Sequence, residues 1–247
     1  MRRISRLPLA SDVEGAMAAA QARLNSEIAG LLPEKWAKTA GAAWDHHDSG
    51  AARSTLHAMA GPRQCRMYCC DSHGDGIDHF RPKSTYPGYT FSWPNLLLSC
   101  TECGRYKGKE FPVDDQSQPL LIDPTVDDPW AHLDFDPETG NLVARYDPVH
   151  GCFSDRGEEP VRQSRLDRRE AVARGMQKAL RQLHERVERA LADPRTTADR
   201  LIADLHQIDE YGLVVWCFVG SGRHDTPLAT LREQLPSLWA QCVSLIG

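Results

Sequence analysis

The sequence of 247 residues predicts an α+β protein in which a small cysteine-bracketed core lies between two helical regions. Apolar residues recur every three or four positions before residue 62 and after residue 160, which is the spacing of amphipathic helices. The stretch 63–160 is instead rich in glycine, proline and cysteine and has only brief apolar runs. We therefore expect an N-terminal helical region (1–62), a core with a loop-rich extension (63–160) and a C-terminal helical region (161–247).

Local patterns predict the elements before and within the core. The Ala-rich stretch 12–32 and the stretch 49–60 predict helices, and the second ends at a Gly-Pro stop signal. Brief apolar runs predict strands over 76–80 and 96–99, and residues 101–109 open a short helix. The core is expected to run strand, loop, strand, helix.

One strand and three helices are predicted after the core. A strand over 142–146 follows a cluster of turn residues. An apolar stripe over 172–191 predicts a helix that stops at an Asp-Pro pair, and further helices are expected over 197–216 and 227–246. We expect the stripe to be core, with the alternative that it is a surface for oligomerisation or for docking an ATPase.

Composition limits the classes of function. A net charge of -5 argues against a general nucleic-acid coat protein, because nonspecific binding depends on Lys and Arg at phosphates. Any contact with DNA must therefore be local. No window approaches the roughly 18 to 20 apolar residues of a membrane-spanning helix, and the basic N-terminus does not have the apolar run of a signal peptide. We expect a cytoplasmic protein that does not bind membranes.

Four cysteines form two closely spaced pairs, the spacing of a structural zinc site. Cys65 and Cys69 form a CxxxC, and Cys100 and Cys103 form a CxxC, so four thiolates can close a tetrahedral site. Cys70 is an alternative to Cys65 as the fourth ligand. Three other cysteines are expected to be small buried residues, since free cysteine is often buried: Cys152, Cys217 and Cys242.

An Asp-His pair lies between the two cysteine pairs. Hydrolysis of a phosphodiester needs a base to take a proton from water and a cation to stabilise negative charge. His79 suits the base, because its ordinary pKa is near 6.5, and Asp78 suits a hard cation such as Mg²⁺. In a strand the two side chains point to opposite faces unless the chain bends there.

Four basic residues near this pair are candidate phosphate anchors. Arg81 and Lys83 follow His79, and Arg105 and Lys107 belong to the short helix after the second strand. Helix N-termini also attract anions. Nothing in this set is suited to read base edges, so we expect DNA binding with little sequence specificity.

The order of these motifs resembles the HNH endonucleases, the ββα-metal group. The shared order is a cysteine pair, Asp-His, Asn-Leu, CxxC and Lys-Gly. The segments IDHFRPKS, WPNLLLSC and KGKEFP more narrowly resemble the HNH proteins of bacterial anti-phage systems of the Septu type and their retron-associated relatives. The resemblance covers roughly residues 63–137 and implies a zinc-stapled ββα-metal core that hydrolyses DNA as a defence effector, with a partner ATPase or other defence protein.

The resemblance also implies roles for individual residues. His79 would be the general base, Asp78 a ligand of a catalytic Mg²⁺ or Mn²⁺ ion, and Asn95 the residue that holds the loop carrying the base. Gly104 stands where the family has Asn or His as a second metal ligand. Glu102 and His73 are conceivable substitutes.

The departure at Gly104 keeps a second function open. A glycine offers no side-chain donor to a metal ion, so the chain is alternatively a weakened, zinc-stabilised HNH-like subunit that binds DNA or serves as a scaffold in a defence complex.

Overall fold

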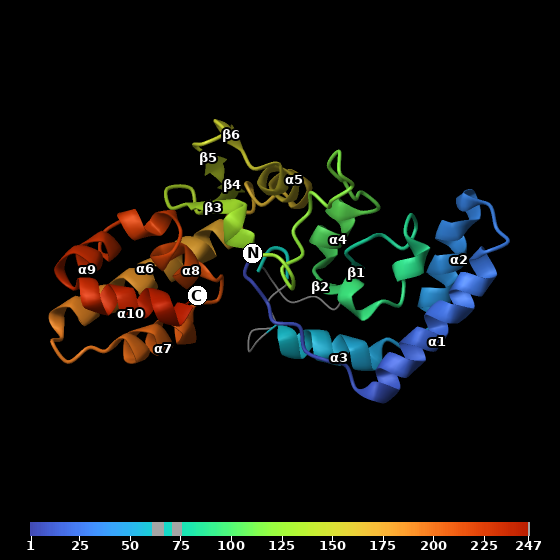
Figure 1. Cartoon of the computed structure of the whole chain (residues 1–247), viewed down its shortest axis with the longest axis horizontal. Helices are drawn as coiled ribbons and strands as arrows, with labels where there is room; N and C mark the ends of the chain where they lie inside the picture. Colours follow the sequence, from blue (N-terminus) through green and yellow to red (C-terminus); the bar gives the residue numbers. More distant parts are fainter. Residues whose placement is uncertain (61–66, 71–75, 247) are drawn as a thin grey trace. The chain divides into compact units, whose positions relative to one another are not determined.

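The structure is a computed structural model that describes residues 1–60, 67–70 and 76–246 (Figure 1). It is an α+β protein, as predicted, with helices and small two-stranded sheets. Its contacts define two compact units, residues 4–126 and residues 1–3 with 127–247. The sequence suggested three segments instead. In the structure the N-terminal helices share a unit with the cysteine-rich segment, and the loop-rich stretch after residue 127 shares one with the C-terminal helices.

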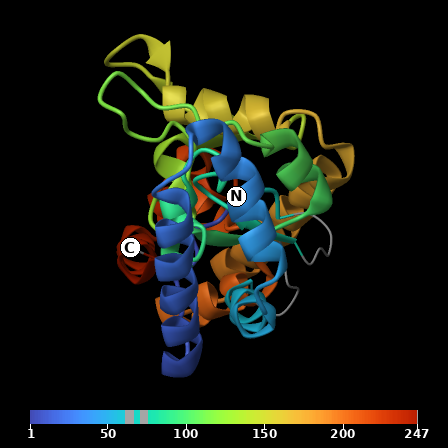
Figure 2. The same cartoon turned by 90° about the vertical axis from the view of Figure 1, so that its right-hand side faces the viewer.

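The first unit, residues 4–126, begins with three helices. These are α1 (Ser11–Ile28), α2 (Pro33–Asp45) and α3 (Gly50–Met59). α1 and α2 pack against each other (Figure 2). The predicted helices over 12–32 and 49–60 are confirmed as α1 and α3, whereas α2 was not predicted. Pro33 opens α2 at a position where proline is favoured, and only one described side chain of this helix, Ala40, is buried.

The predicted strand, loop, strand and helix of the core are confirmed. Strands β1 (Gly76–His79) and β2 (Leu96–Ser99) pair antiparallel, and α4 (Thr101–Lys107) follows β2 directly. Two short 3₁₀ helices lie in the connection between the strands, η1 (Pro87–Tyr89) and η2 (Trp93–Asn95). The three leucines of β2 are fully buried, and each contributes roughly 1.5 to 3 kcal/mol by leaving water. β2 is therefore the apolar centre of this unit.

The N-terminal stretch before α1 is fixed to the entrance of β2 by one arginine. Arg6 donates hydrogen bonds to the backbone carbonyl oxygens of Trp93 (2.9 Å), Pro94 (3.0 Å) and Leu96 (3.1 Å). Its guanidinium also donates to the Thr125 hydroxyl at 2.8 Å and lies over the Trp93 ring. One side chain thus holds the two ends of the unit to the segment that leads into β2.

The second unit combines two small hairpins with helices. Its strands are β3 (Leu133–Asp136), β4 (Asn141–Ala144), β5 (Tyr146–Asp147) and β6 (Cys152–Phe153), and η3 (Pro129–Ala131) precedes them. β3 pairs with β4 and β5 with β6, both antiparallel. Its helices are α5 (Asp155–Ser164), α6 (Glu170–Ala192), α7 (Ala198–Ile208), α8 (Leu213–Phe218), η4 (Ser221–His224), α9 (Leu228–Gln234) and α10 (Pro236–Ile246).

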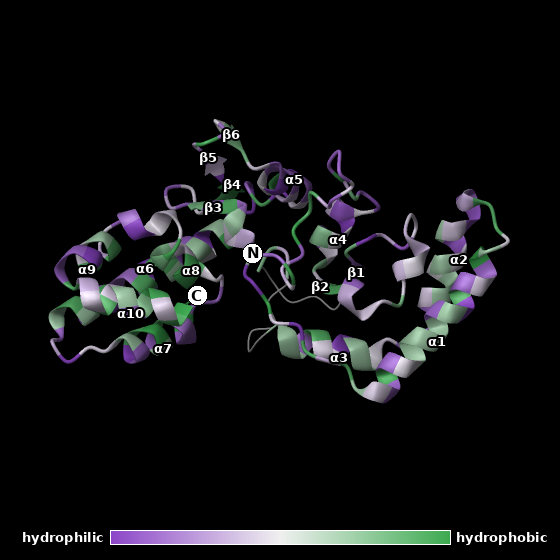
Figure 3. Cartoon of the chain, viewed as in Figure 1, coloured by the Kyte–Doolittle hydropathy of each residue, from purple (hydrophilic) through white to green (hydrophobic). Residues whose placement is uncertain are grey.

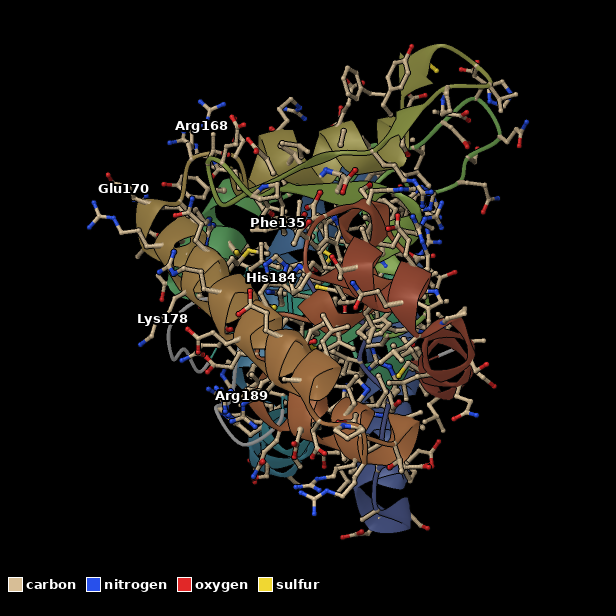
Figure 4. All side chains as sticks on the ribbon, turned by 90° about the vertical axis from the view of Figure 1, so that its left-hand side faces the viewer. Phe135, Arg168, Glu170, Lys178, His184 and Arg189 are labelled. Carbon is tan, nitrogen blue, oxygen red and sulfur yellow. The ribbon has the colours of Figure 1, made fainter. Side chains whose placement is uncertain are left out.

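Helix α6 confirms the predicted helix over 172–191, and its apolar stripe is core. Most of the stripe is buried within the second unit: Val172, Met176, Leu180, Leu183 and Val187. Figure 4 shows Lys178 and Arg189 pointing outward from α6. The stripe is therefore occupied inside the unit and does not form the docking surface that was the alternative.

Two predicted long helices are each divided in two. The helix expected over 197–216 is α7 and α8, separated at Gly212, whose φ of 78° lies in the left-handed region. The helix expected over 227–246 is α9 and α10, because Pro236 begins a new helix and cannot continue the old one. The α8 ribbon has the green of hydrophobic residues in Figure 3, consistent with its burial.

Two further predictions concern single residues and membranes. Cys217 and Cys242 are buried as expected, whereas the prediction for Cys152 was wrong, because β6 leaves it exposed. Within the described part of the chain, no helix is both long and apolar enough to cross a membrane.

Candidate functional site

The pairing of β1 with β2 fixes the Asp-His pair. In the antiparallel register Asp78 lies opposite Leu97 and His79 opposite Leu96. The two side chains meet different neighbours: Asp78 contacts Tyr68, and His79 contacts Trp44. This agrees with the alternation of a strand, since consecutive side chains point to opposite faces.

His79 is buried, with only 5% of its surface exposed. Its Nε2 lies 3.0 Å from the carbonyl oxygen of Thr90, and the Trp44 ring stands edge-on to it at a centroid distance of 4.5 Å. Because a carbonyl oxygen can only accept, Nε2 carries the proton and Nδ1 is the acceptor of the neutral ring. The ring is therefore covered in this structure.

Burial also changes the acidity of His79. Burial lowers the pKa of the imidazole to about 3, and the nearby Lys83 ammonium acts in the same direction. The Thr90 carbonyl opposes the shift, and Lys107 adds to it. The ring is therefore neutral at neutral pH, which a proton acceptor requires, but its basicity in this covered state is weak.

The Asp78 carboxylate is held by two buried neighbours. The Tyr68 hydroxyl donates to its Oδ2 at 2.9 Å, and the Lys107 ammonium lies 3.1 Å from the same oxygen. Burial raises the pKa of Asp78, while Lys107 and Tyr68 act to lower it. Burial also raises the pKa of the Tyr68 hydroxyl, which stays protonated and able to donate. This network ties α4 and the chain before β1 to the strand.

Asn95 joins two segments of the loop that follows His79. Its Oδ1 accepts from the Arg81 backbone N–H at 2.7 Å, and its Nδ2 donates to the carbonyl oxygens of Arg81 (3.1 Å) and Tyr89 (2.9 Å). Asn95 is itself buried. Its position agrees with the loop-holding role that the family resemblance implies.

Three of the four predicted zinc ligands come together. The sulfur atoms of Cys69, Cys100 and Cys103 lie within 4.8 Å of one another, and all three residues are buried. Cys69 Sγ and Cys100 Sγ are 3.8 Å apart, and the Cys103 backbone N–H donates to Cys100 Sγ at the start of α4. These spacings suit a thiolate-bound metal ion such as zinc, which takes four ligands. Cys65 lies outside the described residues, and Cys70 is buried but does not belong to the group of three.

The described side chains do not form a comparable site for a catalytic ion at Asp78. Oδ2 of Asp78 is already engaged by Tyr68 and Lys107, and Gly104 has no side-chain donor. Glu102, one conceivable substitute, is exposed on α4, and His73, the other, lies outside the described residues. Among the described residues, the three cysteines are the one group spaced to hold a metal ion.

The four predicted phosphate anchors occupy different environments. Arg81 and Lys83 are half-buried beside His79, and Arg105 is exposed next to the Tyr106 ring. Lys107 differs from the expectation, because it is buried and its ammonium donates to the His79 carbonyl oxygen at 2.6 Å. The Lys107 ammonium points into the site and is not a positive charge at the surface.

Three residues around the Asp-His pair were not predicted: Trp44, Tyr68 and Thr90. Tyr68 follows from its position, since it precedes a cysteine ligand and so lies close to the core. Trp44 could have been found only with α2, whose signals are Pro33 and a run of good helix formers. No sequence pattern indicates that this tryptophan covers His79.

The fold and the site define an α+β protein with a cysteine cluster for a metal ion beside a buried Asp–Lys pair. Part of the chain is similar to Septu proteins PtuB. It is 35% identical over 120 residues to that of Bacillus mycoides (strain KBAB4), covering 38% of each chain. It is 44% identical over 57 residues to that of Bacillus thuringiensis, covering 23% of this chain and 21% of that protein. The similarity therefore spans well under half of these relatives. No family model and no solved structure matches the chain.

Proposed function

We propose that the chain is an HNH-type endonuclease that hydrolyses DNA phosphodiester bonds as the effector of an anti-phage defence system. The order of β1, β2 and α4 beside a cysteine cluster supports a zinc-stapled ββα core. The similarity to Septu proteins PtuB supports the defence setting. The observation that carries the proposal is the orientation of His79, whose Nε2 is engaged by the Thr90 carbonyl oxygen so that Nδ1 is left to accept a proton.

The chemistry follows from the residues of the chain. His79 takes a proton from water through Nδ1 as the water oxygen bonds to phosphorus. The P–O bond to the leaving nucleotide breaks, and the leaving oxygen takes a proton from solvent. Arg81 and Lys83 bind the phosphate oxygens and stabilise the charge that develops on them. Asn95 keeps the loop of Arg81 at a fixed distance from the base through its three backbone hydrogen bonds. The cysteine cluster, loaded with zinc, fixes α4 against this loop-rich core.

A Mg²⁺ or Mn²⁺ ion at Asp78 was expected from the family resemblance. The described donors do not fit it, because Tyr68 and Lys107 engage Oδ2 and position 104 is glycine. No step of the proposed mechanism is therefore assigned to an ion. The buried Lys107 supplies positive charge next to Asp78 in its place.

Substrate reaches His79 only after the Trp44 ring moves. Trp44 lies in the last turn of α2, and a helix with a single buried side chain is held by few apolar contacts. Displacement of this turn would expose the imidazole and, by removing the main cause of its low pKa, would also raise its basicity. We propose that the described state is closed and that a partner in the defence complex, such as an ATPase, opens it.

A second function is favoured by two specific observations. Gly104 removes a metal ligand, and His79 is covered, so the chain would instead be a zinc-stabilised subunit that binds DNA or serves as a scaffold. This role needs the cysteine cluster and the exposed cations but no reactive base.

Plasmid nicking separates the two functions. The purified chain, alone and with its native partner, is incubated with supercoiled DNA in Mg²⁺, in Mn²⁺ and in a chelator, beside His79→Ala and the control His46→Ala. His46 is an exposed histidine just after α2. Nicking by the wild type and His46→Ala but not by His79→Ala supports the nuclease. Equal inertness of all three, with the partner present, supports the binding subunit.

A further inference from the structure

We infer that Arg81, Tyr86, Tyr89 and Phe111 form a subsite for an unstacked nucleotide, so that the chain prefers single-stranded DNA. We call these four residues the arginine–aromatic cluster. The inference deepens the proposed nuclease function by naming its substrate class. In this subsite Arg81 binds a phosphate and Tyr89 stacks on the adjacent base.

Three aromatic rings surround the guanidinium of Arg81. Its guanidinium carbon lies 5.1 Å from the Phe111 ring centroid, 5.3 Å from that of Tyr89 and 5.7 Å from that of Tyr86. Phe111 is in turn edge-on to Tyr86 at 5.3 Å. Aromatic rings attract the face of a guanidinium, whereas its N–H groups lie in the plane and match a phosphate.

The positive charge of Arg81 also favours an anionic ligand. Among the described residues, neither Arg81 nor Lys83 forms an ion pair, although both lie near His79 in the loop after β1. Arg81 thus places a positive charge beside the candidate base, whereas the Lys83 ammonium also acts on the Asp78 carboxylate. The half-buried position of Arg81 strengthens its attraction for a phosphate, because the pair is partly shielded from water.

Asn95 organises the cluster before any ligand binds. Its side chain bonds the backbone of Arg81 on one side and of Tyr89 on the other. The guanidinium and the tyrosine ring therefore keep their spacing without a loss of loop freedom on binding. This role of Asn95 also connects the subsite to the loop that carries the base.

The exposure of Tyr89 favours single-stranded DNA over duplex DNA as the ligand. Tyr89 is 46% exposed, so its side chain can be reached from solvent while Trp44 covers His79. A base in a duplex already has both faces stacked on its neighbours, whereas a base in a single strand is free to stack on the ring. Such stacking strengthens binding by roughly fivefold to a hundredfold per base and depends little on its identity.

The test measures binding in the His79→Ala background, in which hydrolysis does not interfere. Fluorescence anisotropy compares labelled oligothymidylate of about 12 nucleotides with a blunt duplex of the same length. Tyr89→Leu is expected to weaken single-strand binding by about tenfold and to leave duplex binding unchanged. Tyr89→Phe keeps the stacking face and should bind like the parent. Tyr146→Leu, which removes a tyrosine that is 50% exposed in the second unit, should also bind like the parent.

Two results would overturn the inference: equal affinity of Tyr89→Leu and the parent for the single strand, or a duplex bound as tightly as the single strand by the parent. Both are independent of catalysis. A chain that fails to nick plasmid yet shows the Tyr89 effect retains the subsite and loses the nuclease function. A chain that nicks plasmid without the Tyr89 effect retains the nuclease function and loses the subsite.

Discussion

The Lys107 ammonium lies 3.1 Å from Oδ2 of Asp78. The Lys107 side chain is buried, with 3% of its surface exposed, and that of Asp78 is largely covered, with 13% exposed. The pair connects the last turn of α4 to β1. Lys107 also donates to the His79 carbonyl oxygen, so one cation contacts both members of the Asp-His pair. Lys107 was expected to bind phosphate, but in the structure it stabilises the interior of the site.

Removal of Lys107 should destabilise the first unit strongly. Lys107→Met leaves the Asp78 carboxylate buried without its cation, which typically costs about 3 to 5 kcal/mol of unfolding free energy. Denaturant unfolding measures this loss. The double variant Asp78→Asn, Lys107→Met removes both charges and should recover most of the stability, while Lys109→Met at an exposed position should be neutral. A Lys107→Met variant as stable as Lys109→Met would show that the pair does not stabilise the fold.

Removal of the Trp44 ring should increase the proposed nuclease activity. Trp44→Ala uncovers His79, and the pKa of the imidazole should rise from about 3 toward its ordinary value, because burial is the main cause of the low value. Nicking should increase by about tenfold or more, a fraction of what general bases contribute. The His79 pKa is measured by NMR titration. Trp36→Ala removes another tryptophan of α2 that lies away from His79 and is the matched control; identical activity of the two variants would exclude the covering role.

Restoring a side chain at position 104 should create affinity for a divalent ion. A Cβ at Gly104 would meet only the Ser99 hydroxyl oxygen, at an ordinary distance of 3.7 Å, so Gly104→Asn should fold. Mn²⁺ binding, followed by electron paramagnetic resonance, should tighten by about tenfold or more. Gly88→Asn, at an exposed position of η1 with open space around it, is the control. Equal Mn²⁺ affinity in both variants would mean that a side chain at position 104 does not contribute to ion binding.

The cysteine cluster should bind one zinc ion per chain. Cys103→Ser removes a buried ligand, and the first unit should then lose both its zinc and its cooperative unfolding, since zinc binding to such sites is worth on the order of 10 kcal/mol. Zinc is measured by atomic absorption and unfolding by circular dichroism. Cys152→Ser changes an exposed cysteine and should keep full zinc content. Retention of zinc by Cys103→Ser would remove Cys103 from the ligand set.

The core elements could be predicted from sequence because their signals are local. The leucine run Leu96–Leu98, the CxxC that begins α4 and the turn residues between the strands each define an element within a few positions. Helix α2 was not predicted: apart from two tryptophans its residues are small or polar, and it buries only Ala40. The C-terminal helices break at Gly212 and Pro236. The prediction followed the apolar periodicity across these two residues and therefore missed both breaks.

The meeting of three predicted cysteine ligands followed from the sequence, whereas the surroundings of the Asp-His pair did not. The sequence order brought Asp78, His79 and Asn95 into one candidate set, and three predicted cysteine ligands do meet. The burial of Lys107 and the covering of His79 by Trp44 depend on contacts between segments far apart in the chain. Periodicity and spacing carry no information about such contacts, so the accessibility and the pKa of the base could not be derived from them.

The anchoring of Arg6 has a consequence for the boundaries of a minimal fragment. A truncation that begins at the first cysteine would remove the donor to three carbonyl oxygens at the entrance of β2, and one that stops before Thr125 would remove a further partner of the guanidinium. A deletion series would then show a loss of function that comes from the missing Arg6 contacts and not from the removal of a reactive residue. Fragments intended to isolate the reactive segment should therefore retain residues 4–126 as one piece.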